Sequence, residues 1–176
     1  MDSLMNFILI YDGDLKANGS LEHKQEIRHV FHNQLSELWK HSPVQPSESL
    51  IKKIGDYSFF PLVAEGRKEF VELEILMLRP DYGHGYVVQG GDIDNRLKTL
   101  FDSFRMPKNI DEIPSNTKKE DPFYCLLEDD ILISKLSINA DRLLEPEKSK
   151  SYVKLIIHVQ IKRLPLLGGN MMITLG

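Results

Sequence analysis

The residues best able to do chemistry are carboxylates that gather at two places in the chain. The first is the string DIDN at residues 92–95, and the second is the string EDD at residues 128–130. Carboxylates brought close together repel one another unless a cation compensates them. Mg²⁺ is the natural partner because it binds a few carboxylate oxygens and keeps several of its waters. The sequence therefore predicts a hard divalent metal at these acids, a chemistry that points toward phosphodiester cleavage.

Spacing places the first group of acids at the start of a helix. Asp92 can cap that helix while Asp94 and Asn95 occupy its first turn, where the exposed N–H groups and the helix dipole favour carboxylates. Lys98 and Asp102 follow Asp94 at i+4 and i+8, so the three side chains share one polar face. The apolar residues of the same segment recur on another side, which we expect to face a sheet.

The second group precedes a predicted strand at residues 131–138. If that strand pairs near the predicted strand at residues 71–77, the acids at residues 128–130 reach the start of the second helix. Two distant elements would then complete one metal site.

An ordinary structural explanation exists for both groups. Asp is among the commonest residues at a helix N-cap, and an Asp94–Lys98 pair on a helix surface is worth at most about 0.5 kcal/mol. An acidic turn before a strand is usually solvated. A purely structural acidic cluster therefore stands as an alternative to the metal site.

The order of the predicted helices and strands indicates an α+β domain, in which two main helices pack on a small mixed β-sheet. Residues 81–91 contain four glycines and read as a loop, residues 107–122 as an exposed polar excursion, and residues 164–176 as an apolar tail. The predicted helices cover residues 21–40, with Ser20 as the N-cap, and a segment from Asp92 that stops at Pro107. The predicted strands cover residues 7–11, 57–63, 71–77, 131–138 and 152–162.

Composition bounds the class of protein. A chain of 176 residues is most economically one domain, residues 1–176, and 41% hydrophobic with 27% charged residues is ordinary for a globular protein. The single cysteine, Cys125, cannot form an internal disulfide, which favours a cytoplasmic location. Its apolar neighbours predict a buried structural thiol.

Several partners are not expected from the pattern. No apolar run approaches the roughly 20 residues of a membrane span, and no phosphate-loop signature predicts a nucleotide cofactor. The formal net charge of −4 neither supports nor excludes DNA, because part of the negative charge would sit on metal ligands.

The string GGDIDNRLKTLFDSF, followed later by an acidic pair that opens a strand, resembles the RusA family of Holliday junction resolvases. That family shows a D-L-D-N-x-x-K-x-x-x-D helix start and a later L-D-D before a strand, and the element order is similar over most of the chain. The resemblance implies a RusA-like fold and a homodimer that cuts branched DNA with Mg²⁺, or with Mn²⁺ in its place. It places the metal-binding aspartates on Asp92, Asp94 and Asp130, with Asp129 as the neighbouring acid. It places the essential lysine on Lys98.

Other residues are assigned supporting roles by the same comparison. Asn95 and Asp102 match positions that support the site rather than perform chemistry. A diverged member of the same fold, which binds DNA or a protein without cutting, remains the alternative function. The residues that we expect to contact DNA are Arg96, Arg105, Lys108, Lys118 and Lys119.

Overall fold

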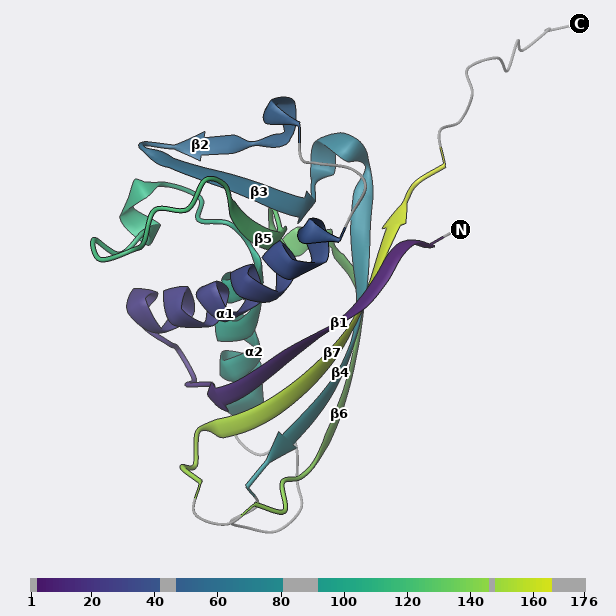
Figure 1. Ribbon diagram of the computed structural model, residues 1–176. Coiled ribbons are helices and arrows are strands. Elements are labelled where there is room, and N and C mark those ends of the chain that lie inside the picture. The colour runs from purple at the N-terminus through teal and green to yellow at the C-terminus, as the bar shows by residue number, and fades with distance from the viewer. Residues whose placement is uncertain (1–2, 42–46, 81–91, 146–147, 166–176) are drawn as a thin grey trace, which may run out of the picture.

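The computed structural model describes residues 3–41, 47–80, 92–145 and 148–165, which form two β-sheets and two main helices (Figure 1). The larger sheet has the strand order β1 (Ser3–Asp14), β7 (Tyr152–Arg163), β4 (Glu69–Arg79) and β6 (Ile133–Arg142). In this sheet β7 runs antiparallel to both neighbours, whereas β4 and β6 run parallel. The smaller sheet has the order β2 (Lys52–Ile54), β3 (Tyr57–Val63) and β5 (Phe123–Leu127).

Helix α1 (Leu21–Lys40) begins as predicted, because the Ser20 hydroxyl accepts a hydrogen bond from the His23 N–H at 3.2 Å. Helix α2 covers Asp92–Phe104, and four short 3₁₀ helices complete the set within the described residues. These are η1 (Glu48–Leu50), η2 (Glu65–Arg67), η3 (Ile110–Glu112) and η4 (Asp130–Leu132).

The main core lies where α1 and α2 cover one face of the larger sheet (Figure 1). Alternate residues of β1, β4 and β7 are buried on that face, as the period-two patterns predict. Phe31 of α1 meets Phe104 of α2 there, with ring centroids 4.9 Å apart. No described helix covers the opposite face, where Ile8 and Ile10 are each about half exposed.

A second, smaller core corrects one prediction. Met106 and Ile113 are buried against Phe59, Phe123 and Cys125, so the 107–122 segment is anchored through its first half rather than wholly exposed. The prediction of a buried Cys125 thiol is confirmed, and burial raises its pKa to about 12.

The α+β expectation is confirmed, but the strands divide into two sheets instead of one. The sequence prediction missed β2 and β5. The string FYCLL of β5 is a short apolar run without alternation, because β5 pairs in parallel with β3 and is buried along most of its length. No helix in the described parts of the chain is long and apolar enough to cross a membrane. The predicted loop at 81–91 and the tail beyond residue 165 lie outside the described residues.

Candidate functional site

The start of α2 carries charged side chains that make no described ion pair. The helix begins at Asp92, as predicted, although the side chain of this residue lies outside what the structure describes. Asp94 and Lys98 are exposed, and none of the described ion pairs includes either of them. Both side chains are therefore available to a ligand.

Thr99 and Arg96 fix this part of the helix to the rest of the protein. The Asn95 carbonyl accepts a hydrogen bond from the Thr99 hydroxyl at 3.2 Å, and that hydroxyl accepts one from the Gly19 N–H at 2.9 Å. The Arg96 guanidinium donates to the carbonyl of Ser151 at 3.4 Å, just before β7. The first turns of α2 thus lie at the end of the larger sheet where β7 begins.

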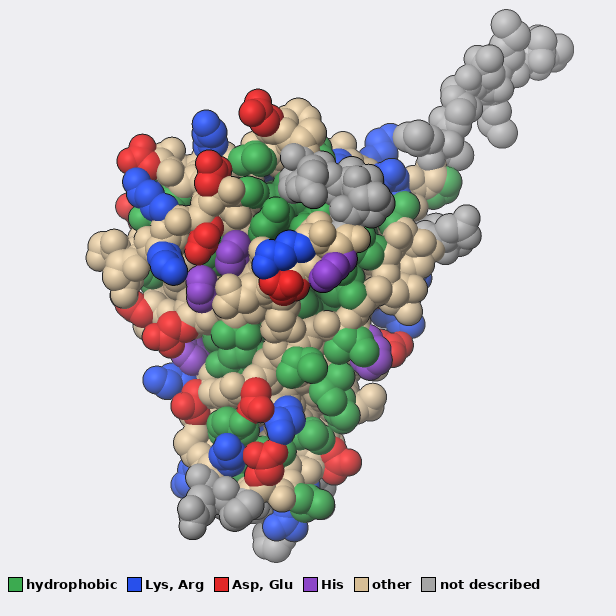
Figure 2. All heavy atoms as spheres, viewed as in Figure 1, with side chains coloured by type: hydrophobic (Ala, Val, Ile, Leu, Met, Phe, Trp, Pro, Cys, Tyr) green, Lys and Arg blue, Asp and Glu red, His purple; other side chains and the backbone are tan. Residues whose placement is uncertain are grey.

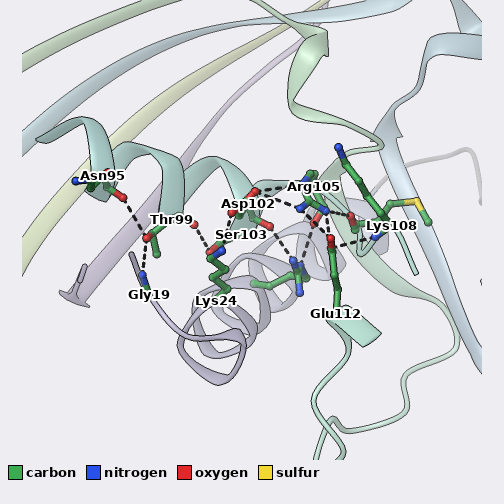
Figure 3. A network of polar contacts seen from close by, with 11 residues as sticks. Gly19, Lys24, Asn95, Thr99, Asp102, Ser103, Arg105, Lys108 and Glu112 are labelled. Carbon is green, nitrogen blue, oxygen red and sulfur yellow. Dashed lines mark hydrogen bonds and ion pairs between the residues drawn. The ribbon is translucent and has the colours of Figure 1, made fainter. Parts of the chain in front are cut away.

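The other end of α2 is enclosed by a network of ion pairs (Figure 3). The Asp102 carboxylate lies 2.7 Å from the Lys24 ammonium and 3.2 Å from the Arg105 guanidinium. Arg105 also contacts Glu112 at 2.8 Å. Burial alone would raise the pKa of Asp102 and of Glu112, but their cationic partners hold both below their ordinary values. Both carboxyls are therefore charged at neutral pH.

Arg28 of α1 completes this network from the opposite helix. Arg28 is only 3% exposed, and its guanidinium donates to the Arg105 carbonyl at 3.0 Å and to the Asp102 carbonyl at 2.7 Å. A third bond reaches the Gln25 side chain at 2.6 Å. The last carbonyls of a helix have no partners within it, so Arg28 acts as a cap for α2. Sequence reasoning missed it, because a mid-helix arginine carries no local sign of a partner so distant in the chain.

The network bears on two assignments made from sequence. Arg105 is 8% exposed, and its guanidinium is held by two carboxylates of the protein itself, which argues against its predicted contact with DNA. Asp102 supports the joint between α1 and α2, through Lys24 and Arg105, rather than the exposed acids at the helix start.

The second acidic group, residues 128–130, forms a fixed turn before β6. Glu128 pairs with Lys52, and its carboxylate accepts a hydrogen bond from the Glu65 N–H at 3.1 Å. Asp129 caps η4 by accepting from the Ile131 N–H at 3.2 Å, and it also lies 3.3 Å from the Lys108 ammonium.

Asp129 and Asp130 are joined to each other by a hydrogen bond between their carboxyl groups. Burial, followed by the hydrogen bond and charge of Asp129, raises the pKa of Asp130. Burial acts on Asp129 in the same direction, but the hydrogen bond from Asp130 and the contact with Lys108 lower its pKa overall. The negative charge of Asp129 therefore opposes ionisation of Asp130, a repulsion that a bound cation would relieve.

The two acidic groups do not meet within one chain. The Met106 N–H donates to the Leu127 carbonyl at 2.9 Å, so the turn at residues 128–130 lies beside the C-terminal end of α2. The start of α2 is about 20 Å away, at 1.5 Å per residue over the helix. Among the described residues, no group of three or more His, Cys, Asp or Glu side chains is placed to hold a metal ion.

Strand direction explains why the expected convergence is wrong. The predicted pairing of β6 with β4 is confirmed, with Ile133 opposite Val71. The two strands are parallel, however, so β6 starts where β4 starts, whereas α2 follows the end of β4. The acids before β6 therefore lie at the far end of the sheet from the acids that open α2.

The lysines predicted to contact DNA lie on the surface near the smaller sheet. Lys108 is paired with Asp129, and Lys119 lies 3.4 Å from Asp56 and over the Tyr57 ring. Lys118 is exposed at the rim of a hollow of about 310 Å³ between α1 and the segment before β5. Lys108 thus lies beside the acidic turn, whereas Lys119 lies near the starts of β3 and β5, at the opposite end of the smaller sheet from that turn.

Basic and acidic side chains are interspersed over the face drawn in Figure 2, without a continuous patch of one sign. The electrostatic footprint of a duplex-binding surface is therefore not seen on that face. Comparison with known proteins adds no relative, because no protein-family model and no curated protein matches the chain. The interpretation of the site depends on its own residues.

Proposed function

We propose that the protein is a Mg²⁺-dependent endonuclease that cleaves branched DNA as a homodimer, with each metal site built from both chains. The observation that carries the proposal is the placement of two acidic groups at opposite ends of α2. One comprises the exposed Asp94 beside Lys98, and the other is the hydrogen-bonded pair Asp129 and Asp130. The resemblance of the DIDN string to RusA resolvases supports the same reading.

The residue types suit the metal. Carboxylate oxygens are the ligands that Mg²⁺ and Mn²⁺ prefer, and Asp92, Asp94 and Asp130 would supply them, with Asp129 beside them. The metal supplies an activated water and neutralises charge on the scissile phosphate. Lys98 lies one helical turn beyond Asp94 and has no ion-pair partner among the described residues, so its ammonium is available to a phosphate oxygen.

The distance between the two acidic groups favours a metal site shared between two chains. Carboxylate oxygens bind Mg²⁺ at about 2 Å, so acids at the two ends of α2 cannot share an ion within one chain. In a two-fold symmetric dimer, a patch on one chain meets a different patch on its partner twice. Asp94 would then lie beside Asp130 of the partner subunit in two equivalent sites, which suits the two cuts needed to resolve a branched junction.

The remaining parts of the proposal concern DNA and location. Arg96, Lys108, Lys118 and Lys119 would contact the phosphate backbone of the branched DNA, which makes binding weaken with added salt. The free, buried Cys125 supports a cytoplasmic location, because it needs no oxidising compartment.

The direct test is cleavage of a synthetic four-way junction and of a matched linear duplex, with Mg²⁺, with Mn²⁺ and with EDTA. We expect junction cleavage that requires metal and that falls at least about a hundredfold in Asp94→Asn, equivalent to nearly 3 kcal/mol of transition-state stabilisation. Asp111→Asn, which removes an exposed carboxylate on η3, is the matched control and should cleave normally. Full cleavage by Asp94→Asn, or junction binding without any cleavage by the unmodified protein, would reject the proposal.

A further inference from the structure

Strand β6 leaves one edge of the larger sheet open. It is ten residues long, lies last in the strand order, and pairs on its outer side with no described strand. The segment contains no proline, so nothing in its backbone prevents a further strand from adding. A long unpaired edge of this kind is a template for another chain.

The opposite edge of the same sheet, strand β1, is covered at its centre by a side chain of α1. The Gln34 side chain of α1 donates to the Ile10 carbonyl at 2.7 Å and accepts from the Ile10 N–H at 2.8 Å, which occupies the outward backbone groups of β1 at its centre. One edge is therefore blocked by the protein's own helix. The other is left for a partner.

We propose that β6 pairs antiparallel with β6 of a second copy of this chain, around a two-fold axis at Ile138. In this register Lys135 lies opposite Asp141 of the partner subunit, and the same pair recurs on the other side of the axis. Ser137 lies opposite Asn139 of the partner subunit, and Ile138 opposite its own copy. The two larger sheets then form one continuous sheet.

Charge selects this register over its neighbours. Lys135 lies opposite Glu72 and Asp141 opposite Leu78 in the pairing with β4, so both project from the same face of the sheet. Opposite charges directly across an antiparallel pair attract. An axis at either neighbouring residue of β6 would place uncharged side chains opposite both Lys135 and Asp141. Both charge pairs would then be lost.

Apolar side chains favour the same arrangement on the helix-covered face. Leu136 is 39% exposed although it points toward the core side, next to Leu73 of β4. In the proposed register it lies opposite Ala140 of the partner subunit, a small residue that leaves room for it. Ile138, half-buried against the core, meets its copy on the axis. Pairing therefore covers apolar surface that a single chain leaves open.

The interface also bears on the metal site, in a way that rests on the proposed function. Antiparallel pairing places the start of each β6, next to Asp130, beside the end of its partner strand. That end of the sheet, where Arg142 lies opposite Arg79, also holds the first turns of α2, because Arg96 reaches Ser151 before β7. The pairing thus brings the two acidic groups of different chains to the same end of the joined sheet.

A charge swap tests the interface without any DNA. We expect Lys135→Asp and Asp141→Lys each to raise the dimer dissociation constant roughly tenfold, since each puts like charges opposite one another twice. The double variant K135D/D141K restores the attraction and should dimerise as well as the unmodified chain. Lys53→Asp, at an exposed lysine of β2, is the matched control. Sedimentation at low salt measures all four.

A cysteine on the axis provides a second measurement. Ile138→Cys should form a disulfide-linked dimer on mild oxidation, because the residue faces its own copy at a distance that a disulfide spans. Ser134→Cys on the same strand should not, because it faces Arg142 of the partner subunit. A monomeric unmodified chain, or a dimer insensitive to the swaps and without the Ile138→Cys link, would overturn the interface. A dimer with the expected behaviour but without nuclease activity would reject only the proposed function.

Discussion

The two ends of α2 use the same kinds of side chain for different purposes. At the C-terminal end, Asp102 and Arg105 are enclosed by partners from α1 and η3. At the start of the helix, Asp94 and Lys98 are exposed and have no ion-pair partner among the described residues. Charge at one end holds the fold together, while charge at the other remains available to a ligand. Substitutions at the two ends should therefore separate stability from activity.

The largest effect on stability is expected from Arg28→Met. This change removes the donors that satisfy two buried carbonyls at the end of α2. Leaving buried acceptors without partners costs about 1–3 kcal/mol each, so the free energy of unfolding should fall by about 3 kcal/mol. Urea denaturation measures it, with Lys98→Met at the open end as the control. A fall in the unfolding free energy of less than about 1 kcal/mol would show that water satisfies the two carbonyls as well as Arg28 does.

The second-largest effect on stability is expected at low pH, through the carboxylates at the C-terminal end of α2. The pKa values of Asp102 and Glu112 are lower in the folded protein than in the unfolded chain, against the effect of burial, because of Lys24 and Arg105. The unfolded chain therefore takes up protons first as the pH falls, and stability is lost below about pH 4. The variant D102N/E112Q should show a flatter dependence of unfolding free energy on pH between about 5 and 2. An unchanged slope would mean that other carboxyls dominate acid unfolding.

The smallest effect on stability is expected at the open end of the helix. Lys98→Ala removes an exposed side chain from the middle of a helix and should change the free energy of unfolding by less than about 0.5 kcal/mol. The same variant should lose most of its junction cleavage if the ammonium contacts the phosphate. Loss of stability without loss of cleavage would reverse the roles that we assign to the two ends.

Parts of this comparison could be read from the sequence and parts could not. Local signals were sufficient for the helices, because Ser20 caps α1 and the apolar periodicity of α2 ends near Phe104. The direction of β6 relative to β4 has no local signal, and it is this direction that separates Asp130 from Asp94. The Arg28 cap and the β5 strand depend on tertiary packing in the same way, so neither was predicted.

The most direct test of a metal site built from two chains is a mixing experiment with Asp94→Asn and Asp130→Asn. Each variant alone forms dimers in which every site lacks one acid, and neither should nick a four-way junction. Refolded together in equal amounts, half of the dimers contain one chain of each kind and therefore one intact site, so nicking should return to about a quarter of the unmodified level. A mixture as inactive as its components, beside an active unmodified protein, would contradict the shared site.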